Sequence, residues 1–404
     1  MKGIKIQENN GKYVIIAAIP FKHLYGKVRY TNREASEWNP YSEDFNDRID
    51  ETYYQRLIEN ERVKSIEKFI LESLVDQESD STTITTVFPS SMIIAFDVEN
   101  ELKNEDEFVN FDIPNQNNSC LIVDGQHRFA GMQRLYEHTN YNLFLNDKIS
   151  NKVIRNKIEN YLFNCTIILN FTIWEQSQLF INVNFYQKRV NKSLFYDIFG
   201  STPPENRIAK NNGIYLSHML ALFLNNSEKS PLKNFVKLLG TGQGYFSQAF
   251  IVEAIMIHFS TRGVWASIEK DFQNNGNMHE MLPKVFVSYF NAVKDVFSNY
   301  WPNENDIRAS HLVKTTGMGA LIRLLGYMYK LLSVGAYPNL EKVDFENIET
   351  DKLTNLFKEI FRPLKSKEED LFGKESEFAG TGGAGLQSKL YKKLCNELGL
   401  TDTK

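Results

Sequence analysis

Four apolar runs in the first half of the chain have the length and setting of β-strands. Each is bounded by polar or turn-forming residues, and the first ends at a proline, which cannot donate to a neighbouring strand. The runs cover residues 13–20, 92–96, 120–123 and 164–171. The segment 97–118 is rich in Asn, Asp and Glu. The pattern therefore predicts buried strands, with residues 97–118 as an exposed connector between two of them.

Helical spacing dominates the second half of the chain. Apolar residues recur at every third or fourth position there, and also over residues 54–74 with a break near Asn60. Pro203-Pro204 separates the two patterns. The sequence predicts an α+β fold, with a mixed α/β domain over residues 1–202 and a mainly helical domain with a late glycine-rich segment over residues 203–404. Helices of the second domain are expected over residues 207–224, 232–239, 246–259, 281–297, 307–332, 344–361 and 387–398.

The third apolar run leads directly into the most distinctive chemical motif of the chain, Asp124-Gly125-Gln126-His127-Arg128. Asp124 is placed to cap the helix that follows, and Gly125 permits a sharp turn and a close approach. Gln126, His127 and Arg128 would then occupy the first helical turn, where unpaired amides and the helix dipole favour an anion. The motif predicts a phosphate-binding corner. On spacing alone, an ordinary capped helix with a surface arginine explains it equally well.

A second candidate surface follows the next predicted helix, which opens with a capping box formed by Thr172 and Glu175. Basic and amide side chains are mixed just after that helix. Basic groups bind phosphates, and amides read base edges, so the segment predicts a DNA contact, with a solvated loop as the plainer alternative. The candidate DNA-binding residues are Asn184, Gln187, Lys188, Arg189, Lys192 and Ser193.

Composition narrows the choice of function. With 46 basic and 50 acidic residues the net charge is −4, so any attraction to nucleic acid must be local. Three widely spaced cysteines indicate reduced thiols, and no His-x-x-x-His or Cys-x-x-Cys pair offers metal-ligand spacing, so no metal site is expected. No secretory leader pattern is present, and the longest apolar run, residues 13–21, is too short to span a bilayer. We expect a soluble cytoplasmic protein without a membrane partner.

Residues 124–128 spell the signature of the DGQHR-domain family, which the chain resembles and which includes DndB-like proteins of bacterial DNA phosphorothioation systems. The likeness extends to the segments 56–66, 88–96 and 180–194, and so covers roughly residues 10–200. That family is similar to the ParB/sulfiredoxin-like superfamily, in which a related turn contacts nucleotide phosphates. The resemblance implies a ParB-like N-terminal domain and places Arg62 near the motif.

The resemblance implies a DNA-associated regulatory or accessory protein, including transcription regulation, of a DNA-modification or defence system. One alternative is an NTPase or switch that binds ATP or CTP with Mg²⁺ and acts on DNA, with Asp124 and His127 as its catalytic residues. Another is a non-enzymatic helical interaction protein. In both the DNA-associated protein and the NTPase, Gly125 and nearby amides would cradle a phosphate, and Arg128 would neutralise its charge. The implied partners are DNA, a nucleotide, other proteins of the modification system and a second copy of the chain.

Overall fold

The computed structural model describes residues 1–29, 59–79, 88, 90–98, 102–105, 108–138, 151–187, 192–200, 212–240, 243–275, 280–302, 310–379 and 383–400. These residues form two compact units, which divide between residues 189 and 190. The sequence pattern predicts this division after residue 202 instead. The difference arises because helix α6 (Lys192–Gly200) packs against α7 (Asn212–Asn226) and α8 (Gln248–Met256) of the helical unit.

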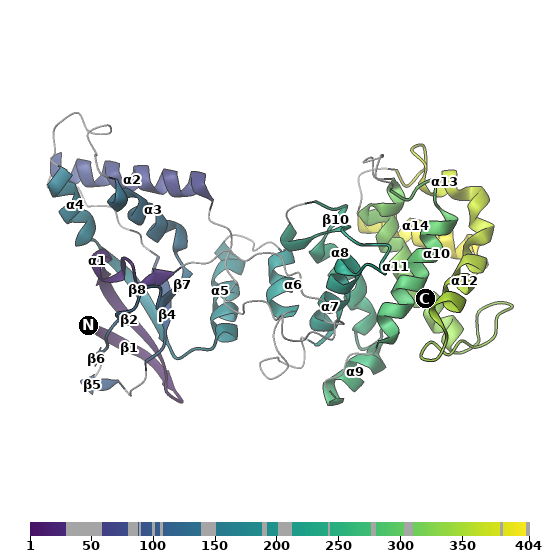
Figure 1. Cartoon of the computed structure of the whole chain (residues 1–404), viewed down its shortest axis with the longest axis horizontal. Coiled ribbons are helices and arrows are strands. Elements are labelled where there is room, and N and C mark those ends of the chain that lie inside the picture. Colours follow the sequence, from purple (N-terminus) through teal and green to yellow (C-terminus); the bar gives the residue numbers. More distant parts are fainter. Residues whose placement is uncertain are drawn as a thin grey trace. The chain divides into compact units, whose positions relative to one another are not determined.

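The first unit is built on a mixed sheet (Figure 1). Among the described residues the sheet has eight strands in the order β3-β7-β4-β8-β2-β1-β6-β5. At its centre, β8 runs antiparallel to β2 and parallel to β4, and β4 runs antiparallel to β7. All four predicted strands are confirmed, as β2, β4, β7 and β8. The strands are β1 (Lys2–Asn9), β2 (Lys12–Pro20), β3 (Val28–Arg29), β4 (Met92–Phe96), β5 (Lys103–Glu105), β6 (Phe108–Asn110), β7 (Cys120–Asp124) and β8 (Leu162–Leu169).

Helices cover one face of this sheet, where alternate strand residues such as Ile15 and Ile167 are fully buried. Two of the helices, α2 and α3, pack so closely at Gly131 that a Cβ atom there would lie only 2.7 Å from Cγ2 of Ile66. Both faces of β7 are buried, and α5 contacts this strand. The helices of this unit are α1 (Phe21–Leu24), α2 (Asn60–Ser79), α3 (Gln126–Glu137), α4 (Asn151–Glu159) and α5 (Ile173–Gln187).

The capping box at the start of α5 is confirmed. The Thr172 N–H donates to Oε2 of Glu175 at 2.9 Å, and the Glu175 N–H donates to Oγ1 of Thr172 at 3.4 Å. Such reciprocal bonds satisfy two backbone donors that the first helical turn leaves without partners.

Two expectations for the sheet were wrong. Residues 97–118 are not simply an exposed connector, because they include β5 and β6, and Val109 of β6 is fully buried beside β1. The alternation of apolar and polar residues in these two short strands is hard to recognise in the sequence, because acidic and amide residues surround it. The run at residues 13–20 is buried on one face only: Ile16 is 42% exposed and pairs with Ile4 of β1, which is 45% exposed. An unbroken apolar run does not reveal that one side of its strand lies open.

The second unit is mainly helical, which confirms the α+β fold class. The helix expected over residues 232–239 is wrong, because this segment holds β9 (Val236–Lys237), which pairs with β10 (Phe246–Ser247). Asn234 adopts a positive φ of 62°, which interrupts helical geometry. Within the described residues, no helix is both long and apolar enough to cross a membrane. The remaining helices are α9 (Ala266–Asn275), α10 (Met281–Val296), α11 (Thr315–Ser333), α12 (Thr350–Phe361), α13 (Glu368–Phe372) and α14 (Ala384–Glu397), with 3-10 turns at Leu238–Gly240, Ile257–Phe259, His311–Val313 and Arg362–Lys367.

Candidate functional site

The turn between β7 and α3 is built on Gly125. Its φ of 101° lies in the left-handed region that favours glycine, and a Cβ atom there would lie 2.7 Å from Cγ of Met92. Gly125 is also the N-cap of α3, and no side chain caps the helix. The expectation that Asp124 caps α3 was therefore wrong. Asp124 is the last residue of β7, and its carboxylate is turned toward Arg128 instead.

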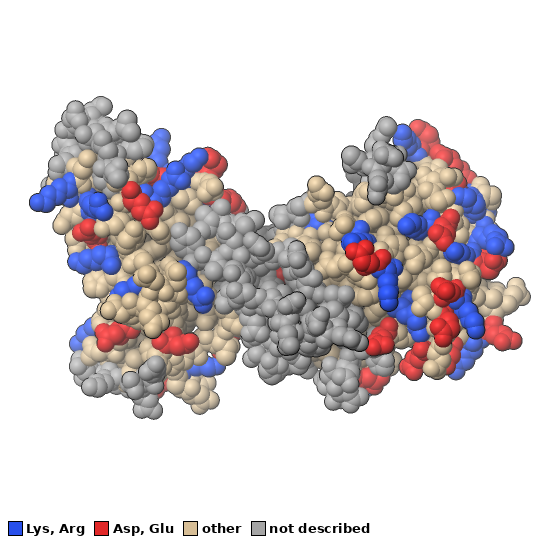
Figure 2. All heavy atoms as spheres, viewed as in Figure 1, with Lys and Arg blue, Asp and Glu red and all other residues tan. Residues whose placement is uncertain are grey.

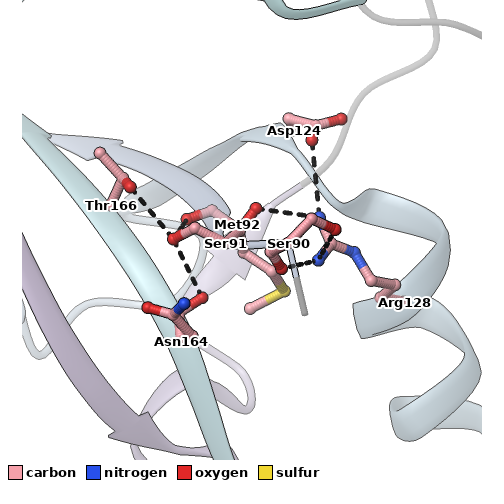
Figure 3. A network of polar contacts seen from close by, with 7 residues as sticks. All are labelled: Ser90, Ser91, Met92, Asp124, Arg128, Asn164 and Thr166. Atoms are coloured by element: carbon pink, nitrogen blue, oxygen red, sulfur yellow. Dashed lines mark hydrogen bonds and ion pairs between the residues drawn. The ribbon is translucent and has the colours of Figure 1, made fainter. Parts of the chain in front are cut away.

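Arg128 points toward the residues that precede β4 (Figure 3). Its Nη1 donates to the carbonyl oxygen of Ser90 and, at 3.0 Å, to Oγ of the same residue. Its Nη2 donates to the carbonyl oxygen of Ser91 at 3.0 Å and lies 3.5 Å from Oδ2 of Asp124. The side chain is only 14% exposed. Arg128 therefore joins the start of α3 to the start of β4 and uses both of its terminal nitrogens to do so.

The charges at this corner influence one another. Burial lowers the pKa of Arg128, the Asp124 carboxylate opposes that shift, and the positive charge of Arg62 adds to it. Burial also raises the pKa of the neighbouring Cys165 thiol to about 12, against the effect of Arg128, so this thiol stays protonated at neutral pH. Two guanidinium groups and one carboxylate leave the corner with one net positive charge, which favours an anion.

The other residues expected at the phosphate site differ in their exposure to solvent and in their hydrogen bonds. Arg62 is exposed in the first turn of α2 and is close enough to Arg128 to lower its pKa. Within the described part of the chain, Arg62 takes part in no hydrogen bond or ion pair. His127 accepts a hydrogen bond at Nε2 from the Glu59 N–H at 3.2 Å, which ties α3 to the residue before α2. Gln126 is buried.

Two serines complete the corner, and no sequence motif indicates either of them. Ser90 and Ser91 supply the carbonyl acceptors of Arg128, 38 and 37 residues before it in the chain. Ser91 Oγ also accepts from Oγ1 of Thr166 at 3.0 Å and donates to the carbonyl oxygen of Asn164 at 3.2 Å (Figure 3). These bonds anchor the start of β4 to β8. No local pattern marks such contacts, because their partners are backbone carbonyls and ordinary hydroxyl groups that lie far apart in the chain.

Most of the second predicted surface lies outside the residues whose side chains the structure describes. Lys188 and Arg189 lie outside the described residues, and Asn184 and Gln187 lie in the last part of α5, where the backbone alone is described. Their predicted DNA contacts therefore remain predictions.

Lys192 and Ser193 belong to α6 in the helical unit. Lys192 is exposed, and its Nζ lies 2.7 Å from Oε1 of Glu253. Ser193 is fully buried, and its Oγ accepts a hydrogen bond from the Ala249 N–H at 3.1 Å. Ser193 thus supplies an acceptor to the first turn of α8, and its buried hydroxyl is not accessible for a DNA contact.

The described residues contain no metal cluster, and the face drawn in Figure 2 carries no broad basic patch. Among the described residues, no three His, Cys, Asp or Glu side chains gather as metal ligands would. On the face drawn in Figure 2, Lys and Arg side chains are interspersed with Asp and Glu over both units. On this face, attraction to an anion therefore depends on individually placed cations.

Comparison with known proteins identifies the family. A family model described as DNA-sulfur modification-associated, DndB, matches residues 10–307, which is well over half of the chain and reaches into the helical unit. Neither the curated proteins nor the solved structures provide a match. The family match agrees with the resemblance carried by residues 124–128 and extends beyond it. The chain belongs to the DndB family of DNA-sulfur modification-associated proteins.

Proposed function

We propose that the protein is a DNA-binding regulatory component of a DNA-sulfur modification system, and that the surface at the DGQHR turn contacts a DNA phosphate. Family membership supports the assignment to a DNA-sulfur modification system. The observation that carries the DNA contact is the setting of Arg62, an exposed arginine that lies near the half-buried Arg128 and forms no ion pair among the described residues. A guanidinium in this position can bind phosphate without first leaving a protein partner.

Arg128 and Arg62 have different roles in this proposal. Arg128 already donates to the carbonyl oxygens of Ser90 and Ser91, so turning it outward would leave those acceptors without their donor. We therefore assign the direct phosphate contact to Arg62. Arg128 holds the corner together and adds positive potential beneath the bound phosphate, because a charge a few ångströms away still acts through the poorly screened protein interior.

The test compares two cations of α2. Arg62→Ala removes the proposed contact, and Lys68→Ala removes an equal charge from the other flank of the same helix, where Lys68 lies 3.7 Å from Glu72. Binding of a labelled DNA duplex is measured by fluorescence anisotropy over a range of salt concentrations. Arg62→Ala should weaken binding, and the slope of log K against log salt should fall by about one. Lys68→Ala should leave both nearly unchanged. Equal effects of the two variants, or binding that ignores salt, would contradict the proposal.

A nucleotide is the other ligand with suitable chemistry, since ATP and CTP present the same phosphate oxygens as DNA. Thermal-shift measurements with ATP or CTP and Mg²⁺ distinguish the two ligands when repeated on Arg62→Ala. A shift that Arg62→Ala removes, without any effect of Arg62→Ala on DNA binding, would favour a nucleotide switch. Phosphate release that depends on Asp124 or His127 would favour an NTPase. The DNA contact predicts neither result.

A further inference from the structure

Phe69 is an exposed aromatic side chain on the same flank of α2 as Arg62. It is 49% exposed, although phenylalanine is usually buried. Seven residues separate it from Arg62, which is close to two full helical turns and about 10.5 Å along the helix axis. The buried face of α2 is formed by Val63, Ile70 and Leu74. Arg62 and Phe69 therefore lie on one side of the buried face, and Lys68 lies on the other.

The ring of Phe69 is held at the DGQHR corner by a second ring. Phe69 and Phe88 make an edge-to-face contact, with centroids 6.2 Å apart and planes at 60°. Phe88 stands two residues before Ser90, whose carbonyl oxygen accepts from Arg128. Phe88 in turn contacts Tyr161, with ring centroids 6.3 Å apart. A chain of aromatic contacts thus supports Phe69 from beneath and leaves about half of its surface exposed to solvent.

We infer that Phe69 is a stacking platform for an unpaired DNA base, and that Arg62 binds the phosphate of the same strand. This inference rests on the proposed function and adds the form of DNA that the corner takes. Exposed aromatic rings next to cations bind single-stranded nucleic acid, because every base has a flat π-face and every nucleotide carries a phosphate. Paired bases hide their faces within the helical stack, so a ring on the side of a helix reaches only a base that has left the stack.

The test uses two oligonucleotides of equal length and charge. One is oligo(dT), and the other carries an abasic site at every position. Phe69→Ala should weaken oligo(dT) binding roughly tenfold and abasic binding far less, because only the first ligand offers a base to stack on. Phe69→Leu keeps apolar packing against Phe88 but lacks a ring, so it should lose binding as Phe69→Ala does. Phe69→Trp should retain binding.

Phe108→Ala is the matched control. Phe108 is 41% exposed, close to the value for Phe69, and it lies in β6, four strands from β4 across the sheet. The control should bind both oligonucleotides as the unaltered protein does.

Several outcomes would overturn the inference. One is that Phe69→Ala binds oligo(dT) normally, and another is that it loses both oligonucleotides equally. A third is that Phe69→Leu binds like the unaltered protein, which would make Phe69 a packing residue only. If the unaltered protein binds duplex DNA through Arg62 but does not bind oligo(dT), this inference fails while the proposed function stands. If it binds neither DNA, both fail.

Discussion

Each unit contains a cluster of polar groups turned away from solvent, but the two clusters differ in how completely they are closed. At the DGQHR corner, Arg128 is 14% exposed and Asp124 25% exposed, and Ser90 lies at the surface. In the helical unit, Gln248 and His218 are fully buried beside Asp197. The first cluster reaches the surface of its unit, so a ligand can contact the exposed residues around it. The second is enclosed by α6, α7 and α8.

The enclosed cluster is organised around the amide of Gln248. Its Oε1 accepts from the Leu239 N–H at 2.8 Å, and its Nε2 donates to Oδ1 of Asp197 at 3.0 Å. The same nitrogen lies 3.2 Å from Nδ1 of His218. A buried polar network of this kind fixes how helices meet, because a group that loses its partner there cannot turn to water. A polar cluster that is fully enclosed therefore holds helices together, whereas one that is partly exposed is a candidate binding site.

Arg128→Ala should have the largest effect on stability. It removes the donor to the carbonyl oxygens of Ser90 and Ser91 and leaves Asp124 without its counter-charge, which together should cost about 3–5 kcal/mol. Hydrogen exchange resolved by peptide should show faster exchange in β4 and α3. Arg155→Ala is the control, because that arginine is 51% exposed, and its loss should cost less than about 1 kcal/mol. If exchange stays slow in β4 and α3, Arg128 is not structural, and a direct phosphate contact becomes the better assignment.

The corner shows what a contiguous motif can and cannot predict. Five adjacent residues, 124–128, were enough to locate the turn, the helix after it and the family. They could not predict which way Arg128 points, because its acceptors come from Ser90 and Ser91, far earlier in the chain. Nor could they show that Gly125 would take the N-cap position from Asp124, since that depends on the backbone φ at the turn.

The other elements of the fold also divide into those that the sequence can predict and those that it cannot. Long periodic segments such as α10 and α14 were predictable, because an amphipathic helix carries its own pattern of buried positions. The three-residue strand β6 was not, since it is stabilised by pairing with β1, about a hundred residues away. The Gln248 cluster was also unpredictable, because its residues come from three separate helices and none is unusual in its local sequence.

His258 allows a second test of the closed interior of the helical unit. Its Nε2 lies 3.2 Å from the Ile322 carbonyl oxygen, and burial lowers its pKa from 6.5 to about 4, with Arg323 adding to the effect. The unfolded chain therefore binds a proton more readily than the folded one between these values. Stability from this residue is fully present above pH 6.5 and falls by about 3 kcal/mol as the pH drops to 4.

The measurement compares the unaltered protein with His258→Gln, which keeps a polar side chain but does not titrate. Denaturant unfolding of the helical unit is followed from pH 7 to pH 4. The variant should lose less stability over this range, and the difference between the two curves should grow below pH 6.5. Parallel curves would mean that His258 binds a proton as readily in the folded state as in the unfolded one, and the interior would then be less closed than the burial of its side chains indicates.

The smallest effects come from one substitution made in both clusters. Ser193→Ala leaves the buried Ala249 N–H without its acceptor and should cost about 1–2 kcal/mol in the helical unit. Ser91→Ala removes the bonds to Thr166 and Asn164, but Ser91 is only half-buried, so water can replace the lost partner and the cost should stay below about 1 kcal/mol. Hydrogen exchange of α8 and of β4 reports the two costs separately. Equal costs would erase the distinction between a closed and an open cluster. A larger cost at Ser91 would reverse it, because the DGQHR corner would then be the more tightly closed of the two.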